Sequence, residues 1–224
     1  SAGMTNTIVK RVPENIEDLI AVISLYRPAP MDSIPTYIKN RHNKSGIVYK
    51  IPQLKPILEV TYGCIVYQEQ VMQIFRSLAG YSYGRADIVR RAMAKKKHSV
   101  LENERKAFVY GEKNPDGSVN CPGCVANGIS EKAANELFDD MTSFASYAFN
   151  KSHAAAYATL SYETAYLKRH YFKEYMSALI TSVLDNSTKV TEYTAECESK
   201  GVKVLGPDIN LSMEGFVSEE DGIR

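Results

Sequence analysis

The sequence lacks several patterns that would place a protein in a functional class at once. No stretch approaches the roughly 18 to 20 consecutive apolar residues that a membrane-spanning helix needs, and no basic-then-apolar leader stands at the amino end. Over 224 residues, 44% are hydrophobic, enough to bury a core as one large domain or two small ones. We therefore expect a globular, cytoplasmic protein with no membrane partner.

Signatures of several enzyme classes are missing as well. The sequence contains no Gly-x4-Gly-Lys-Ser/Thr, no Gly-x-Gly-x-x-Gly and no His-Glu-x-x-His. It also contains no Asp-x-Asp, although two-metal phosphoryl transfer needs converging carboxylates around metal ions about 3.5 to 4 Å apart. The scattered acidic residues therefore predict neither a catalytic group nor a metal site in this chain.

Cysteine is scarce, with residues at Cys64, Cys121, Cys124 and Cys197. Only Cys121 and Cys124 form a Cys-x-x-Cys pair, whereas a structural zinc site needs four ligands, usually from two such pairs. A thioredoxin-like site would need the pair at the mouth of a helix after a strand, but 114–130 is a loop-like stretch rich in Gly, Pro and Asn. Reduced thiols are favoured, and a zinc-stabilised interaction domain is the alternative.

Apolar residues recur at three-and-four spacing through most of the chain, which predicts helices. The expected helices cover 16–25, 33–41, 67–78, 85–97, 99–113, 130–147, 152–171, 174–184 and 188–200. Short strands are expected at 47–49 and 202–205, and a hairpin is expected to begin within 216–223. Runs of helices with few strands predict a mainly α fold, with minor short strands near the C-terminus.

We expect a helical domain over residues 1–200, with room for a flexible insertion at 114–129. Residues 201–224 would then begin a following, small strand-containing segment. Ser1 in place of Met, and a turn-like Glu-Asp-Gly close to Arg224, predict that the chain is a piece of a longer protein.

Basic residues gather in one stretch although the net charge is only +1. Between positions 76 and 97 the local balance is +6, from seven basic residues and one acid. At helical spacing, one face of the helix expected at 85–97 carries Arg90, Arg91, Ala94, Lys95 and Lys97. Arginine forks suit phosphate oxygens and lysines add mobile charge, but a solvated surface is the commoner meaning of such a face.

A second candidate lies at the expected start of a later helix, for which Ser152 is a natural cap. Helix amino termini attract anions through unpaired N–H groups, and Lys151 beside His153 would strengthen this attraction. Tyr147 or Phe149 could stack on a nucleic-acid base. Two buried aromatics and a histidine that only caps or packs are the simpler interpretation of this segment alone.

A third segment, 62–70, is apolar and runs into three amide or acid side chains, Gln68, Glu69 and Gln70. Taken alone, it is typical of a packing segment with a polar helix start, and it predicts no function.

Six segments in fixed order resemble the C-family replicases, the alpha subunits of bacterial DNA polymerase III. They are Leu25-Tyr-Arg-Pro-Ala-Pro-Met31, Thr61-Tyr-Gly-Cys-Ile-Val-Tyr-Gln-Glu-Gln-Val-Met72, Leu78-Ala-Gly-Tyr81, Ala86-Asp-Ile-Val-Arg-Arg-Ala-Met-Ala-Lys-Lys96, Tyr147-Ala-Phe-Asn-Lys-Ser-His-Ala154 and Pro207-Asp-Ile-Asn210. The resemblance spans nearly the whole chain and implies the fingers region, a mostly helical part that follows the palm.

The resemblance implies roles for two sets of residues. Those approaching the triphosphate of the incoming nucleotide are Arg90, Arg91, Lys95 and Lys96. Those lining the pocket of the nascent base pair are Tyr147, Phe149, Asn150, Lys151 and His153. The family's aspartates that bind Mg²⁺ belong to the palm, upstream of residue 1, so this chain is expected to bind nucleotide without polymerising it.

The resemblance also implies partners: a DNA primer-template, deoxynucleoside triphosphates, and the sliding clamp and other replisome subunits through the full-length protein. The chain departs from the family at Ala29, Ala94 and Ala148, where glycine is common; a methyl group is tolerated there if none of the three needs a positive φ. The loop with Cys121 and Cys124 has no family counterpart that we can place.

The alternative function is a helical nucleic-acid-binding or protein-binding module with no part in catalysis. Such a module would bind DNA through salt-sensitive phosphate contacts without preferring nucleotides. The polymerase hypothesis instead requires that the basic helix at 85–97 and the aromatic junction at 147–153 share one cleft.

Overall fold

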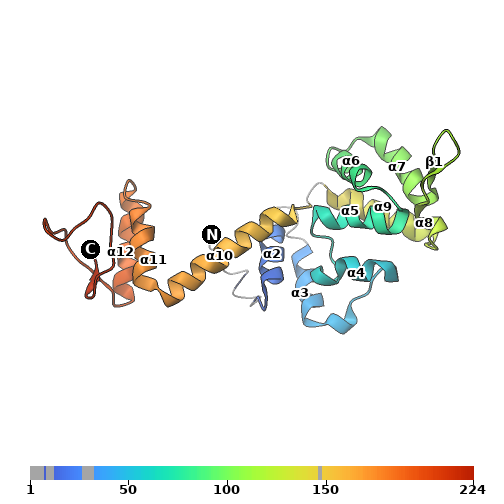
Figure 1. Cartoon of the computed structure of the whole chain (residues 1–224). Helices are drawn as coiled ribbons and strands as arrows, with labels where there is room; N and C mark the ends of the chain where they lie inside the picture. The colour runs from blue at the N-terminus through green and yellow to red at the C-terminus, as the bar shows by residue number, and fades with distance from the viewer. Residues whose placement is uncertain (1–7, 9–12, 27–32, 146–147) are drawn as a thin grey trace. The chain divides into compact units, whose positions relative to one another are not determined.

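The computed structural model describes residues 8, 13–26, 33–145 and 148–224, and these are mostly helical (Figure 1). The helices are α2 (Ile16–Leu25), α3 (Ile34–His42), α4 (Lys55–Leu58), α5 (Gln68–Ala79), α6 (Tyr83–Ala94), α7 (His98–Tyr110), α8 (Gly123–Ala126), α9 (Glu131–Ala145), α10 (Lys151–His170), α11 (Phe172–Thr181) and α12 (Ser187–Ser199). The strands are β1 (Glu112–Lys113), β2 (Val119–Cys121), β3 (Lys203–Val204) and β4 (Gly222–Ile223). The predicted mainly α class is confirmed.

The chain forms two compact units, residues 1–158 and 159–224. The second unit has its own core, in which α11, α12 and the strand pair contribute Met176, Ile180, Cys197 and Ile223. This core groups α11 and α12 with the strands, and the domain boundary expected at residue 200 stays a prediction. β3 and β4 pair in parallel, and Val217 and Arg224 exchange two backbone hydrogen bonds, as the hairpin expected there requires.

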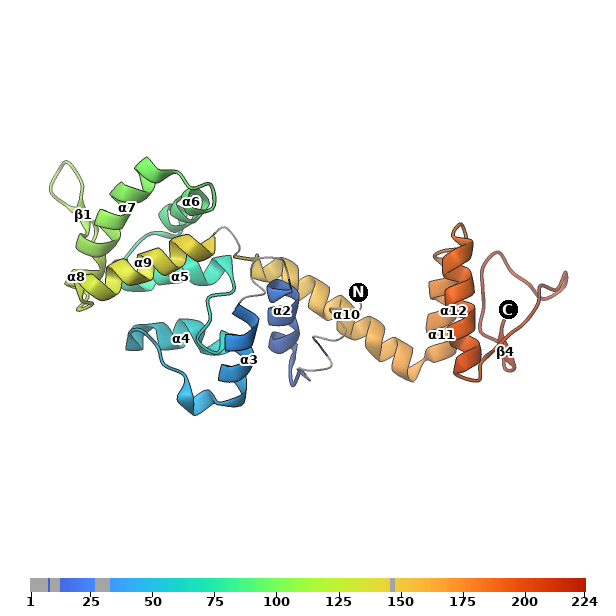
Figure 2. The same cartoon turned by 180° about the vertical axis from the view of Figure 1, so that it is seen from behind.

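The main core of the first unit lies among α5, α6, α7 and α9. Phe75 of α5 meets Phe108 of α7 and Phe138 of α9 edge to face, with ring centroids 5.0 and 6.1 Å apart. All three side chains are fully buried. Figures 1 and 2 show α6 and α7 above α5 and α9 from opposite sides. Edge-to-face rings add to the free energy of burial, so these phenylalanines fix how the helices pack.

Local signals account for several helix ends. Ser82 caps α6 by accepting from the Arg85 N–H at 3.2 Å, and Ser130 caps α9 through the Ala133 N–H at 3.3 Å. α5 ends at Gly80, whose φ is +75°, and a side chain there would also lie 2.5 Å from Pro122. Only glycine satisfies both conditions without strain.

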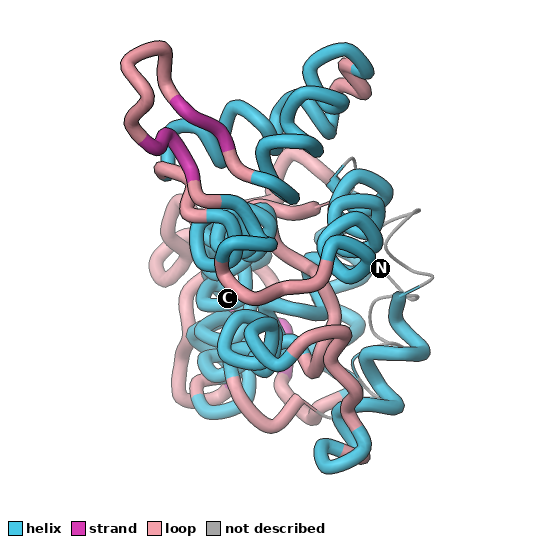
Figure 3. The backbone as a smooth tube through the Cα atoms, turned by 90° about the vertical axis from the view of Figure 1, so that its right-hand side faces the viewer, coloured by secondary structure: helices cyan, strands magenta, loops and turns pink. Residues whose placement is uncertain are grey.

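The segment at 114–129, expected as a flexible insertion, has regular structure. β1 and β2 form an antiparallel hairpin, seen in magenta in Figure 3, and α8 follows it. Short polar strands give almost no alternating apolar signal, which is why the sequence predicted only a loop.

The strand expected at 47–49 is wrong. The first unit has a second core, here called the α2–α3 core, to which Leu25 of α2, Tyr37 of α3 and Ala154 of α10 contribute. Ile47 packs against it and Val48 is 91% exposed, an alternation that resembles a strand. No strand among the described residues pairs with this segment, and it runs from one short 3₁₀ turn, Lys44–Gly46, towards another, Pro52–Leu54.

None of the helices in the described ranges is long and apolar enough to cross a membrane.

A buried charge network joins α2 to α3. The Asp18 carboxylate accepts from the Arg41 guanidinium at 3.0 and 3.1 Å and from the Tyr62 hydroxyl at 3.0 Å. The two charged side chains are only 5% and 6% exposed. A buried pair of this kind is held in place by the penalty for leaving one partner alone.

We predict that D18A destabilises the chain by about 3 to 5 kcal/mol, because the Arg41 cation stays buried without its main partner. The free energy of unfolding in urea, followed by circular dichroism, measures this. E14A is the matched control, because Glu14 pairs with the same guanidinium at 3.3 Å but is 66% exposed. That variant should lose no more than about 1 kcal/mol, and equal losses in the two variants would contradict the prediction.

Candidate functional site

The basic helix predicted at 85–97 is α6, and its two faces differ as expected. Ala86, Val89 and Met93 are fully buried against the core. A stripe at helical spacing on the opposite side is exposed and consists of Gly84, Ile88, Arg91 and Lys95. The predicted apolar face is therefore confirmed, and the exposed face contains an apolar residue as well as the cations.

Arg90 does not share this exposure. Its side chain is only 14% exposed, and it donates to Asp87 Oδ1 from Nε at 3.1 Å and from Nη2 at 2.5 Å. Arg91 is 67% exposed and reaches the other oxygen of the same carboxylate, with Nη2 2.7 Å from Oδ2. One carboxylate thus holds both arginines, and the hydrogen bonds from Arg90 lower the pKa of Asp87 below its usual value.

The C-terminal end of α6 projects lysines into solvent. Lys96 N–H donates to Met93 C=O and Lys97 N–H to Ala92 C=O, which is the Schellman arrangement. Its left-handed position, usually glycine, is taken by Lys96 with φ of +52°. Lys95 and Lys96 are exposed, and neither forms an ion pair with another residue that the structure describes.

The aromatic junction is held by pairing with the residues just before α5. Phe149 N–H donates to Val66 C=O at 3.1 Å, and Gln68 N–H donates to Phe149 C=O at 2.9 Å. These two bonds make a parallel bridge between Tyr67 and Phe149. Tyr147, the other aromatic predicted for the site, lies outside the described residues.

The cap of α10 is Asn150 rather than Ser152. Its Oδ1 accepts from the His153 N–H at 2.8 Å, the bond expected of a capping residue. Both residue types cap helices well, and the pairing of Phe149 decides between them because it fixes where the extended backbone ends. Asn150, predicted to line the nucleotide pocket, therefore also has a local structural task.

Lys151 lies between two carboxylates. Its backbone N–H is 3.1 and 3.0 Å from the two oxygens of Glu69, and its Nζ is 3.1 and 3.0 Å from those of Glu17. The ammonium also lies 5.4 Å from the centre of the Tyr67 ring. The anion attracted by this helix terminus is, in this structure, a carboxylate of the same chain.

His153 contacts two aromatic rings. Its ring centroid is 5.4 Å from that of Phe149 and 4.8 Å from that of Tyr157, one turn further along α10. His153 and Tyr157 are exposed, while Phe149 is partly buried against the α2–α3 core. The simpler interpretation, two buried aromatics and a histidine that only caps or packs, therefore fits Phe149 in part and fits the ring contacts of His153.

The polar start of α5 contributes residues that the sequence analysis left without a role. Gln70 is buried; its Oε1 accepts from the N–H groups of Val66 and Tyr67 at 2.8 and 3.0 Å. Gln68 Nε2 donates to Ala148 C=O at 2.9 Å. The only signal in the sequence is three adjacent amide or acid side chains. The partners of Gln68 and Glu69 lie about 80 positions further along, whereas those of Gln70 lie shortly before it.

Both candidate segments are attached to α5. α6 packs along α5, and Phe149 pairs with the residues at the N-terminal end of α5. Of the alanines that replace family glycines, Ala94 and Ala148 have no positive φ, so their methyl groups add no backbone strain. Ala29 lies outside the described residues. A single cleft shared by the two segments stays a prediction.

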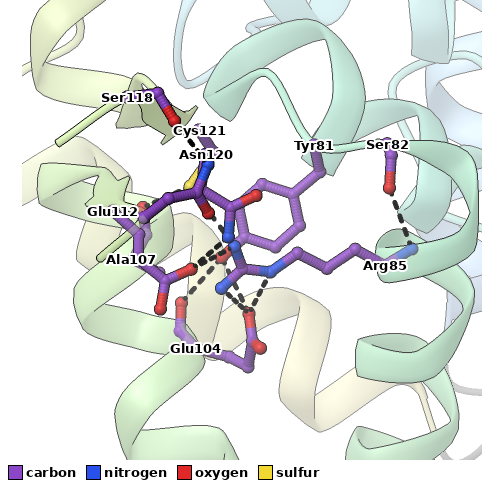
Figure 4. Close-up of polar contacts among 10 residues, drawn as sticks. Tyr81, Ser82, Arg85, Glu104, Ala107, Glu112, Ser118, Asn120 and Cys121 are labelled. Carbon is purple, nitrogen blue, oxygen red and sulfur yellow. Dashed lines mark hydrogen bonds and ion pairs between the residues drawn. The ribbon is translucent and has the colours of Figure 1, made fainter. Parts of the chain in front are cut away.

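Arg85, the first cation of α6, is committed to the hairpin (Figure 4). Its guanidinium donates to Glu104 at 3.0 and 3.1 Å and to Glu112 of β1 at 2.6 Å, and it lies over the Tyr81 ring. Cys121 accepts a weaker bond from Arg85 at 3.6 Å. Arg85 therefore holds the hairpin against α6 and α7 and is not available to a phosphate.

The thiols of Cys121 and Cys124 are free and buried, and burial raises the pKa of Cys124 to about 12. A thiol in that environment is a poor nucleophile. No group of three or more His, Cys, Asp or Glu side chains in the described ranges could hold a metal ion.

Comparison with known proteins agrees with the resemblance in the sequence. Residues 1–116 match the family described as bacterial DNA polymerase III alpha subunit finger domain. The chain is 47% identical to DNA polymerase III subunit alpha of Thermus aquaticus, over 98% of this chain and 18% of that protein. The corresponding proteins of Chlamydia muridarum and Bacillus subtilis are 46% and 41% identical over 100% of this chain. The chain spans under a fifth of the length of these relatives.

We predict that Asp87 titrates below the usual aspartate value of about 3.9, as its lowered pKa requires. Because the folded-state pKa is depressed, the stabilisation is present above the ordinary pKa and is lost as pH falls through the folded-state value. Carboxyl NMR shifts followed against pH measure the midpoint. R90Q should raise it more than R91Q, since Arg90 makes the stronger hydrogen bonds, and the reverse order would contradict the assignment.

Proposed function

Because the chain belongs to the family of bacterial DNA polymerase III alpha-subunit finger domains, we propose that it binds the incoming deoxynucleoside triphosphate and the nascent base pair during template-directed DNA synthesis. The synthesis itself is an activity of the longer parent polymerase. The chain would take part by orienting the substrate, so that a reaction carried out elsewhere in the parent meets an aligned nucleotide.

The observation that carries the proposal is the attachment of both candidate segments to α5. The cations of α6 and the Phe149–His153 junction are far apart in sequence, yet each is fixed to the same helix. A nucleotide needs this combination, since its triphosphate requires cations while its base requires a flat apolar face.

The cations of α6 would act in different ways. Arg91 is the most accessible arginine fork, and Lys95 and Lys96 are exposed at the end of the helix. Their charge would stabilise the triphosphate before and during displacement of its leaving group. Arg90 is more buried, and its bonds to Asp87 hold that carboxylate in one direction. Because the same carboxylate pairs with Arg91, it also fixes the direction of the Arg91 guanidinium.

The junction would position the base pair. Phe149 and His153 present rings at the start of α10, and Asn150 and Lys151 lie between them. Stacking on such rings tolerates any base, which a template-directed enzyme requires.

Mg²⁺ would be supplied to the reaction by groups outside this chain. The described residues contain no cluster of carboxylate, thiol or imidazole groups suited to a metal, so we assign no step here to the ion. We further propose that the parent polymerase binds a DNA primer-template in the cytoplasm, and that the sliding clamp and other replisome subunits contact it elsewhere.

We predict that R91A, made in the full-length parent polymerase, raises the KM for the incoming nucleotide roughly 10- to 100-fold. This range corresponds to the loss of one charge-assisted hydrogen bond of about 1.5 to 3 kcal/mol. Arg91 is preferred to Arg90 for this test, because removing the more buried arginine also frees the Asp87 charge. Single-nucleotide primer extension at limiting nucleotide measures the effect.

K132A provides the control, since Lys132 on α9 is 88% exposed and pairs only at 4.0 Å. Near-normal extension by R91A at limiting nucleotide would reject the proposed role. Weaker, salt-sensitive DNA binding by R91A with an unchanged KM for nucleotide would instead favour a module that binds only the nucleic-acid backbone.

A further inference from the structure

The start of α10 is fastened to the start of α5 by main-chain pairing and by side chains. Besides the bridge at Phe149, Gln68 Nε2 donates to Ala148 C=O at 2.9 Å across 80 positions in the sequence. On the other side of the bridge, the Glu69 carboxylate receives the Lys151 N–H, with its oxygens at 3.1 and 3.0 Å. The backbone is therefore held just before, at and just after Phe149.

Glu69 accepts its hydrogen bond from a main-chain group and therefore holds the backbone of α10 rather than a side chain. Its partner is the N–H of the first residue of α10, one of the groups that a helix leaves unpaired at its amino end. A carboxylate at that place satisfies the donor and interacts favourably with the helix dipole. The position of α10 is thus fixed independently of the Lys151 side chain, which turns towards Glu17 at 3.0 Å.

Gln68 and Glu69 are also firmly placed themselves. They are the first two residues of α5, and Gln70 in the same turn is 4% exposed. Gln70 is bonded to Thr61 Oγ1 at 2.7 Å and to the backbone of Val66 and Tyr67. Because these bonds hold the start of α5 in place, Gln68 and Glu69 in turn hold the backbone of 148–151 in place.

We propose that Glu69, assisted by Gln68, is a positioning residue for nucleotide binding: it fixes the backbone from which Phe149, Lys151 and His153 project. This inference rests on the proposed function. Glu69 itself touches neither base nor phosphate in this scheme and acts only through the 148–151 backbone.

The test uses E69A and E69Q in the full-length parent polymerase, with single-nucleotide extension on a primer-template. E69A should lower kcat/KM for the correct nucleotide roughly tenfold, since a small misplacement of a positioned group has effects of this order. Discrimination against a mispaired nucleotide should fall with it, because a loosened pocket loses more for the correct pair. E69Q retains an oxygen that can accept from the Lys151 N–H and should recover most of the loss.

Two further variants separate positioning from general damage. Q73A alters an exposed side chain one turn along the same helix and should leave kcat/KM unchanged. Q68A removes only the bond to Ala148 and should act in the same direction as E69A, but more weakly. Primer-template affinity should be the same in all of them, because the contact is local to the nucleotide pocket.

Several outcomes would overturn the inference. If E69A leaves kcat/KM and discrimination unchanged while R91A raises the KM for nucleotide, the positioning role fails and the proposed function stands. If E69A instead lowers the KM for nucleotide, the Glu69 carboxylate competes with the nucleotide for the N-terminus of α10 and does not act as a positioning residue. If both R91A and E69A behave as wild type, the proposed function fails together with the inference.

Discussion

The pairing of the backbone at 66–68 with Phe149 is the constraint on which the first unit depends. It closes a loop of about 80 residues that contains α5 to α9, and closing a loop of that length costs several kcal/mol of chain entropy. The two backbone bonds contribute about 1 kcal/mol net each and the bond to the charged Glu69 about 1.5 to 3 kcal/mol, so together they do little more than offset this cost. The buried Phe75, Phe108 and Phe138 supply the rest, so the core and the junction form together.

Carboxylates control where the cations of this chain point. Asp87 holds Arg90 and Arg91, Glu17 holds the Lys151 ammonium, and Glu104 with Glu112 holds Arg85. A triphosphate that approached these groups would have to exchange with a carboxylate already in place, except at the exposed lysines. Under the proposed function, binding would therefore begin at Lys95 and Lys96 and extend to Arg91, which is 67% exposed against 14% for Arg90 and 18% for Arg85. Arg85 takes no part, because its pairing belongs to the hairpin.

The sequence predicts well whatever depends on neighbours along the chain. The buried stripe of Ala86, Val89 and Met93, the caps at Ser82 and Ser130 and the glycine end of α5 all follow from local spacing and local hydrogen bonding. It predicts poorly what a distant partner decides. The choice of Asn150 over Ser152 depends on the pairing of Phe149 with Val66 and Gln68, and Glu69 finds its partner 82 positions away. No periodicity contains that information.

The backbone at the end of α6, around Lys95 and Lys96, contains a strained residue. Family glycines are replaced by Ala94 and Ala148 without positive φ, yet Lys96, at the position where glycine usually ends a helix, adopts φ of +52°. For a residue with a Cβ atom this conformation costs about 1 to 2 kcal/mol. A glycine at position 96 would remove this conformational cost, but it would also remove the positive charge. Lys96 combines this left-handed backbone with an exposed side chain that forms no ion pair with any described residue, and both features agree with its proposed contact with the triphosphate.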